Sequence, residues 1–294
     1  MRLLKALIIY NPKSGNAIDL TKINEICSYL KNYEVSIFYS NFEKEITSYL
    51  FLNAKRFELI IVFGGDGTLH EAINGIMRSN ANPYILYIPK GSVNDFAKHI
   101  GIKKKYQKEL EILKYNPQKI DVYQIDNEYF IYTIGCGKFT SISYDKKCYF
   151  LKKYLKRFYY YLKLFKDLLI THKYEIEVYC DNEKYNEEVF IFLFLAINNI
   201  AGFKVRGAKN KIDDGKIKLY LFKYHKLFSS LNLLFFYLFK RKSNYFIKEI
   251  ESDCFVVKSN KLLKLNLDGE GPIYKDEFIV RVIPKRLNFY IKKN

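Results

Sequence analysis

Residues 59–76 run without interruption from an apolar stretch through a glycine-rich turn into a helical pattern, LIIVFGGDGTLHEAINGI. An apolar run without alternation is typical of a strand buried on both faces, as in a parallel sheet. Glycines let the backbone approach a ligand closely, and the N-terminus of the following helix offers N–H groups and a positive dipole to phosphate. The segment therefore predicts a strand–turn–helix unit with an anion site at the turn.

The same alternation extends over residues 1–125. Apolar, β-rich runs occupy Leu3–Tyr10, Val35–Tyr39, Phe57–Phe63 and Tyr84–Ile88. Helical patterns lie between and after them, at 18–31, 44–55, 69–78 and 93–101. This βαβ repeat predicts a doubly wound α/β domain whose strands are all buried on both faces, with its ligand beyond the carboxyl ends of the strands.

Residues 126–284 have a different texture and predict a second, mainly β domain, a sandwich. Closely spaced strand-like runs occupy Tyr129–Ile134, Tyr174–Cys180, Val189–Ile197, Lys216–Phe222, Cys254–Val257 and Phe278–Ile283. Helical insertions are expected near 149–170 and 225–240. A final strand, Leu287–Lys292, is expected to pack back on the first domain within residues 285–294. Two domains agree with a length of 294 residues.

Two further glycine turns follow strands of the first domain. Asn11–Gly15 follows the first strand, and Pro89–Ala97 follows the fourth. Each is a common loop when taken singly, and the GGDGT turn alone could be a tight turn with Asp66 or Thr68 as a helix N-cap. Three such turns at one sheet edge favour a nucleotide site, although neither the P-loop nor the GxGxxG pattern is present.

The blocks NPKSG, GGDGTLHEAINGI and PKGSVNDFAKHIGI, in this order, resemble conserved blocks of the diacylglycerol kinase catalytic-domain family, especially the soluble bacterial lipid kinases. The resemblance continues through KIDV, AINN, AKNKIDDGK and LDGE. It implies an enzyme that uses ATP and Mg²⁺ to phosphorylate a lipid hydroxyl. Diacylglycerol, giving phosphatidic acid, is the leading acceptor, and other lipid alcohols, including sphingoid bases, remain alternatives.

The resemblance also implies roles for individual residues. Nucleotide contacts fall on Asn11, Pro12, Lys13, Ser14, Gly15, Ser40, Gly64, Gly65, Asp66, Gly67, Thr68, Leu69, His70, Glu71, Ser92 and Asn94. A carboxylate network around the catalytic Mg²⁺ falls on Asp66, Asp95 and Asp121, and the catalytic carboxylates are Asp268 and Glu270. A structural Mg²⁺ is expected at Asp214 with the backbone carbonyls of Lys211 and Lys216.

Phosphoryl transfer does require positioned phosphates, a metal ion and a carboxylate that takes the acceptor proton. Without the family, the Asp268–Glu270 segment and the Asp213–Gly215 segment would each be ordinary turns. Two departures from the bacterial pattern are His70, where Asn or a similar small polar residue is more frequent, and Gly207, where Pro is more frequent. A third, Ser92 in place of Thr, keeps a hydroxyl.

The chain carries 49 Lys and Arg against 31 Asp and Glu, a net charge of +18 that attracts anionic lipid, nucleotide or nucleic acid. Part of this excess also fits a compositional bias towards Lys, Asn, Ile, Tyr and Phe. Five dispersed cysteines without a CxxC pair indicate a reducing cytoplasm. No nucleic-acid recognition module is legible, so no specific nucleic-acid partner is expected.

Apolar residues recur at helical spacing from Leu151 to Leu169 with basic residues on other faces, and Leu227–Phe239 is followed by a basic triplet. Such helices either lie on anionic lipid or pack on the core with a solvated basic face. No run reaches the roughly 20 apolar residues of a membrane span. The expectation is a cytoplasmic protein, peripheral on the inner face of the membrane, where it meets its lipid acceptor; a homodimer is left open.

Other functions remain open as well. An NAD kinase would share the GGDGT turn and a similar first domain, but the NDFA and DGE blocks favour the lipid kinase. A non-catalytic nucleotide or lipid sensor would keep the fold, and the intact Asp66, Asp95, Asp268 and Glu270 argue against it.

Overall fold

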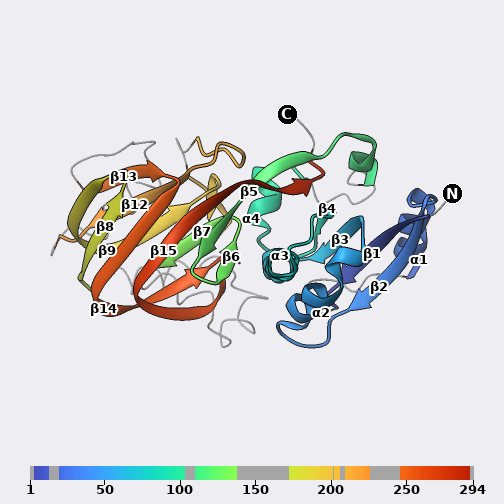
Figure 1. The fold of residues 1–294 in the computed structure, drawn as a ribbon, viewed down its shortest axis with the longest axis horizontal. Coiled ribbons are helices and arrows are strands. Elements are labelled where there is room, and N and C mark those ends of the chain that lie inside the picture. The colour runs from blue at the N-terminus through green and yellow to red at the C-terminus, as the bar shows by residue number, and fades with distance from the viewer. Residues whose placement is uncertain are drawn as a thin grey trace, which may run out of the picture.

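The computed structural model describes residues 3–12, 20–102, 110–137, 172–200, 202–205, 209–225 and 246–291. Figure 1 shows helices gathered in the N-terminal half and strands dominating the other half. The predicted α/β half followed by a mainly β half is confirmed.

The first half is built on four parallel strands in the order β2-β1-β3-β4. The strands are β1 (Leu4–Tyr10), β2 (Tyr33–Tyr39), β3 (Leu59–Gly64) and β4 (Tyr84–Pro89). The helical elements are α1 (Leu20–Tyr29), α2 (Glu45–Asn53), η1 (Ala54–Arg56), α3 (Asp66–Ser79), α4 (Asp95–His99) and η2 (Glu111–Lys114). Alternate residues of the strands enter two separate cores, one with α2, α3 and α4 and the other with α1, as a doubly wound sheet requires.

One strand differs from the expectation of burial on both faces. No position of β2 is fully buried: its residues are half-buried or exposed, and Ile37 and Tyr39 are 37% and 43% exposed. β2 pairs only with β1 among the described strands, so it is an edge strand and solvent reaches its outer side. An apolar run by itself does not distinguish an edge strand from a central one.

The second half has eleven described strands. They are β5 (Gln118–Ile125), β6 (Glu128–Phe130), β7 (Thr133–Cys136), β8 (Tyr174–Cys180), β9 (Glu183–Leu195), β10 (Asn199–Ile200), β11 (Phe203–Lys204), β12 (Ile217–Lys223), β13 (Ile247–Ser252), β14 (Cys254–Leu267) and β15 (Glu270–Phe289). Among them β7, β9, β8 and β14 pair in a closed circuit around an apolar core that includes Phe192, Phe194 and Phe255.

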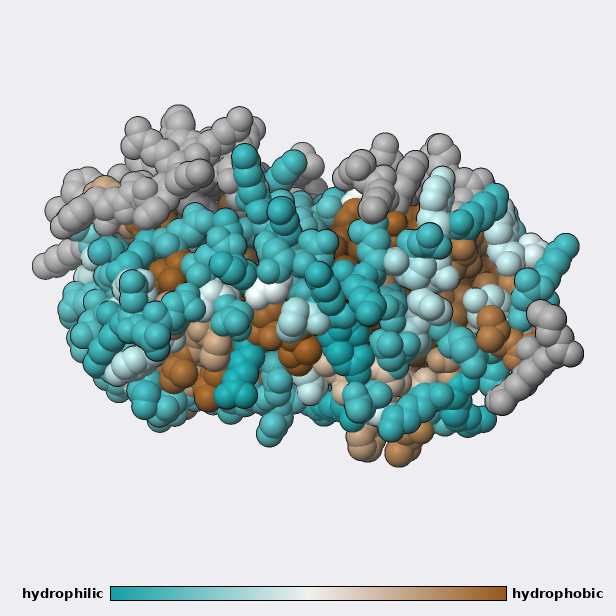
Figure 2. Space-filling view, turned by 45° about the horizontal axis from the view of Figure 1, so that its top comes forward, coloured by the Kyte–Doolittle hydropathy of each residue, from teal (hydrophilic) through white to brown (hydrophobic). Residues whose placement is uncertain are grey.

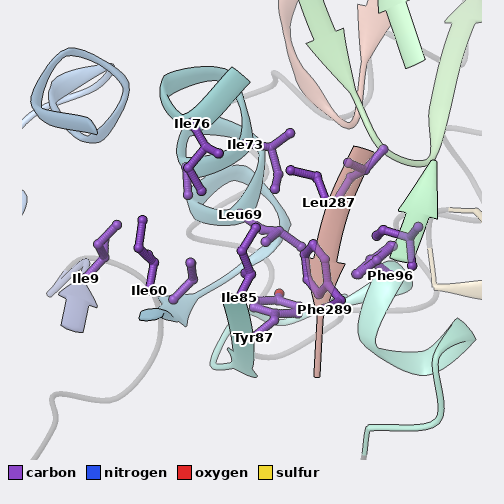
Figure 3. Close-up of a cluster of buried hydrophobic side chains, with 14 of the residues drawn as sticks. Ile9, Ile60, Leu69, Ile73, Ile76, Ile85, Tyr87, Phe96, Leu287 and Phe289 are labelled. Atoms are coloured by element: carbon purple, nitrogen blue, oxygen red, sulfur yellow. The ribbon is translucent and has the colours of Figure 1, made fainter. Parts of the chain in front are cut away.

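β15 belongs to both halves. It pairs antiparallel with β14 and β5, and its Asn288 and Phe289 pair in parallel with Tyr84 and Ile85 of β4. Figure 3 shows Leu287 and Phe289 beside Tyr87 and residues of α3, in the core of the first half. The hydrogen-bonded sheet therefore continues from one half into the other.

The predicted helical insertion at 149–170 and the segment Leu227–Phe239 lie outside the described residues. Within the described ranges, no helix is long and apolar enough to cross a membrane. The face drawn in Figure 2 is mostly hydrophilic, with apolar residues in small, separate groups.

Candidate active site

The parallel registers bring the carboxyl ends of the four strands together. Tyr10 lies opposite both Tyr39 and Phe63, and Gly64 lies opposite Pro89. The turns beyond them are hydrogen-bonded to their neighbours, since Asn11 N donates to the Phe63 carbonyl at 3.4 Å and Lys90 N donates to the Gly64 carbonyl at 2.7 Å. Buried Ser40 follows at the same edge, its N donating to the Tyr10 carbonyl at 3.0 Å.

Close backbone contact explains the glycines of these turns. A Cβ on Gly91 would lie 2.7 Å from the Cα of Gly65, so the second and third turns touch backbone to backbone. A Cβ on Gly64 would lie 2.3 Å from the side chain of Thr68, whose Oγ1 is 3.5 Å from Nδ2 of Asn11. The third turn is shaped by Asn94, which takes a left-handed φ of 53° and donates through Nδ2 to the Gly91 carbonyl at 2.7 Å.

Two carboxylates meet at this edge. Asp66, the first residue of α3, accepts a hydrogen bond from Asp95 N at 3.1 Å through Oδ2, while its buried Oδ1 has no partner within the described part of the chain. Burial, together with the charge of Asp95, raises the pKa of Asp66 to about 7. Asp95 is 2% exposed and accepts from Gly202 N at 3.0 and 3.1 Å, so a residue of the second half closes on it.

Glu270 enters the site from the second half. A Cβ on Gly67 would lie 2.0 Å from Oε1 of Glu270, so this carboxylate rests directly on the first turn of α3. Burial raises the pKa of Glu270, and the nearby His70 offsets part of that increase. A carboxylate with a raised pKa is suited to accept a proton, and this one lies beside the N-terminus of α3.

Asp268 stands two residues before Glu270 in a left-handed conformation, with φ of 49°. Its Oδ1 accepts from Tyr132 N and Thr133 N, both at 3.0 Å, and its Oδ2 accepts from Ile131 N at 2.9 Å. The Tyr132 hydroxyl donates to the Asp268 carbonyl. Asp268 therefore ties the Glu270 turn to the backbone that leads into β7.

His70 connects α3 to the same turn. Its Nδ1 is 3.1 Å from Oδ2 of Asp268, and its Nε2 is 3.2 Å from Nδ2 of Asn74. Burial lowers the pKa of His70, but its hydrogen bond to Asp268 and the charges of Asp268 and Glu270 together raise it by more, so the net direction is upward.

The other residues expected at the nucleotide lie in different surroundings. Leu69 is fully buried in the core. The Glu71 carboxylate lies near the backbone N–H groups of Lys44 and Ile46 at the start of α2; burial raises its pKa, and these N–H groups offset part of the increase. Pro12 and Ser92 are exposed at the strand edge, whereas Lys13, Ser14 and Gly15 lie outside the described residues.

Asp121 makes its contacts away from the glycine turns. Its Oδ2 accepts from Gly215 N and its Oδ1 from Lys285 N, both at 2.7 Å, and burial raises its pKa despite these bonds. In the same turn Asp214 Oδ1 accepts from Lys216 N at 3.2 Å. The described residues contain no group of three or more His, Cys, Asp or Glu side chains placed to hold a metal ion. The structural Mg²⁺ at Lys211, Asp214 and Lys216 stays a prediction.

Sequence reasoning did not identify three residues that complete the site. Gly202 supplies the N–H to Asp95, Tyr132 holds the Asp268 turn, and Asn74 orients His70. Only Gly202 carried a local signal, a glycine after Asn198-Asn199, and its φ of 86° accounts for that glycine.

Comparisons with known proteins agree with this geometry. The model of the diacylglycerol kinase catalytic domain matches residues 5–125. A diacylglycerol kinase of Bacillus subtilis (strain 168) is 30% identical over 94% of this chain and 93% of the relative. One from Staphylococcus haemolyticus (strain JCSC1435) is 32% identical over 73% of this chain and 66% of the relative. A crystal structure of a putative diacylglycerol kinase from Bacillus anthracis str. Sterne superposes with a TM-score of 0.83 at 20% identity, over 99% of both chains, which supports the fold.

Proposed function

Because this chain belongs to the diacylglycerol kinase family, we propose that it transfers the γ-phosphate of ATP to the hydroxyl of diacylglycerol. The observation that carries the proposal is the contact of Glu270, from the second half, with Gly67 in the first turn of α3. Phosphates bound at that helix end would lie beside a carboxylate able to accept the acceptor's proton.

The reaction divides between the two halves. The glycine turns and the N-terminus of α3 hold the phosphates of ATP, and Glu270 orients the acceptor hydroxyl and takes its proton as the hydroxyl oxygen bonds to the γ-phosphorus. The bond between that phosphorus and the bridging oxygen breaks, and ADP leaves. Burial of the site supports the transfer by excluding water, which would otherwise compete as acceptor.

A magnesium ion fits Asp66 and Asp95. Hard carboxylate oxygens are the ligands that Mg²⁺ prefers, and the buried Oδ1 of Asp66 has no partner in the described part of the chain. When bound, the ion neutralises charge on the phosphates and on the two carboxylates. Without it, two buried carboxylates repel one another, in agreement with the raised pKa of Asp66.

We place the reaction at the inner face of the membrane, because the acceptor is a lipid and the net charge of +18 favours anionic surfaces. Sedimentation with vesicles tests this expectation. Binding to phosphatidylglycerol vesicles that weakens with salt supports it, and equal binding to neutral phosphatidylcholine vesicles would contradict it.

The activity is tested by transfer of labelled γ-phosphate from ATP to vesicles that contain diacylglycerol, sphingosine or neither, with NAD as a soluble alternative acceptor. We expect labelled phosphatidic acid in the presence of Mg²⁺, and a loss of kcat of about 10²–10⁴-fold in Glu270→Gln. Phosphorylation of NAD alone, or ATP binding without transfer to any acceptor, would falsify the proposal.

A further inference from the structure

His70, in α3, contacts the Glu270 turn of the second half through a hydrogen bond to Asp268. Its Nδ1 lies 3.1 Å from Oδ2 of Asp268, with 13% of the imidazole and none of the carboxylate exposed. His70 stands four positions after Asp66, so it lies one helical turn below the carboxylate at the phosphate-binding end.

The neighbours of His70 assign its proton. Asn74 Oδ1 accepts from Tyr129 N at 3.0 Å, and Asn74 Nδ2 donates to the Tyr129 carbonyl at 2.8 Å. These two bonds fix the orientation of the Asn74 amide, which presents its NH₂ group to the His70 carbonyl at 3.0 Å and to Nε2 of His70 at 3.2 Å. On the other side of the ring, the Asp268 carboxylate can only accept, so Nδ1 carries a proton and donates it to Oδ2 at 3.1 Å.

The other bonds of Asp268 define its role. Three backbone N–H groups and the His70 ring occupy its two oxygens, which uses the acceptor capacity of a carboxylate. Asp268 could take a hydroxyl proton only by giving up buried bonds, each of which costs free energy to leave unmade. Its carboxylate is therefore an anchor for the turn.

We propose that His70 is a positioning residue for phosphoryl transfer: its Nδ1–H bond to Asp268 holds the turn so that the Glu270 carboxylate rests on Gly67. This inference rests on the proposed function. His70 acts through Glu270, and a displacement of that carboxylate by about 1 Å is enough to slow a proton transfer by one to two orders of magnitude.

Two variants separate the bond from the bulk of the ring. His70→Asn places an amide nitrogen at the position of Nδ1 and can keep the bond to Asp268, whereas His70→Leu fills similar space without a donor. We expect His70→Leu to lose about 10–100-fold in kcat with the KM for ATP changed less than about twofold, and His70→Asn to stay within about threefold of wild type. Thermal melting and the Kd for ATP are measured on both variants. Values close to those of the wild type show that a change in kcat is not caused by unfolding.

A double variant tests whether His70 acts through Glu270. In a Glu270→Gln background, His70→Leu should lower kcat by less than about twofold, because residues that act as a unit are not additive. The positioning role would be refuted if the loss of kcat in the double variant equalled the product of the losses in the two single variants. It would also be refuted if His70→Leu were as active as the wild type. A wild type without lipid kinase activity would instead refute the proposed function.

The tautomer gives a readout that does not depend on activity. The chain has four histidines, so ¹⁵N signals of labelled imidazoles can be assigned with single variants. We expect His70 to carry its proton on Nδ1 and to lose that signature in Asp268→Asn, whose side-chain amide can present a donor to the ring. An Nδ1 without a proton in the wild type would overturn the inference.

Discussion

At the scale of single residues, the site depends on two kinds of signal. The glycines of the GGDGT turn and Asp66 could be predicted because their reason is local: a strand end, a close backbone contact and a helix N-terminus follow one another in the chain. The bond of His70 to Asp268 could not, because 198 residues separate the two and only the packed sheet brings them together. Sequence also gives no sign that Asp268 is saturated by backbone donors.

Gly67→Ala tests the contact that carries the proposed function. The new Cβ would lie 2.0 Å from Oε1 of Glu270, and the end of that side chain would have to move. We expect kcat to fall about tenfold or more while the protein remains folded, because the carboxylate is displaced from the reacting groups. The measurement is labelled-phosphate transfer, with the exposed Ser36→Ala as control. Unchanged kcat in Gly67→Ala would mean that Glu270 is not held there during the reaction.

The raised pKa of Asp66 predicts how the stability of the protein depends on pH. Its pKa is about 7 in the folded protein against an ordinary value of 3.8, so between these values the folded state binds more protons than the unfolded state. Without Mg²⁺, the free energy of unfolding should therefore fall as pH rises from about 4 to about 7, by of the order of 3 kcal/mol. Urea unfolding at several pH values measures this change.

Mg²⁺ and a variant provide the controls for that titration. Mg²⁺ should raise the melting temperature more at pH 8 than at pH 5, since it binds the ionised carboxylate. Asp66→Asn should remove most of both effects. A pH profile in Asp66→Asn identical to that of the wild type would assign the titration to another group.

At the scale of elements, most strands and helices of the described ranges were predicted, but β5 and β13 were not, and two boundary differences have local physical causes. α3 begins at Asp66 instead of residue 69, because Gly65 is the N-cap and the apparent turn Asp66-Gly67-Thr68 is already helical. The single run Tyr129–Ile134 divides into β6 and β7, because the N–H groups of Ile131 and Tyr132 donate to Asp268 and not to a neighbouring strand.

Substitution of Glu71 tests what stabilises the N-terminus of α2. The N-cap of α2 is Lys44, with φ of 64° and no capping bond from its own side chain, and the Glu71 carboxylate of α3 lies near the first N–H groups of that helix. Glu71→Ala should lower the free energy of unfolding by about 1–2 kcal/mol, as for loss of an N-cap, and Glu71→Gln should lower it less. Chemical denaturation measures both. We expect the KM for ATP of Glu71→Gln to stay within about twofold of the wild-type value. A larger increase would indicate that Glu71 contacts the nucleotide.

At the scale of the whole molecule, the sequence predicted two different halves and a final strand, Leu287–Lys292, that packs back on the first, but it did not predict one sheet running through both halves. The continuous sheet through β15 depends on pairing between β4 and residues 288–289, which no local pattern specifies. The closure of Gly202 on Asp95 and of Glu270 on Gly67 follows from this junction. The domain boundary at residues 125 and 126 stays a prediction.

Phe289→Ala tests the junction. Phe289 is fully buried in the core of the first half although it belongs to the strand that starts at Glu270. We expect the free energy of unfolding to fall by about 3–5 kcal/mol, because the substitution leaves a cavity. Leu262→Ala, at a position 62% exposed, should change it by less than about 0.5 kcal/mol. Equal stability of the two variants would show that β15 contributes little to the first half.

The parallel pairing of Asn288 and Phe289 with β4 also determines when the sheet can be completed during synthesis of the chain. A nascent chain that has left the ribosome only as far as β14 has β4 without its outer neighbour and has no Glu270. Contacts between partners roughly 200 residues apart form late, since the intervening loop must close first. We therefore expect a growing polypeptide to remain inactive until β15 has emerged as far as Phe289 and has paired with β4.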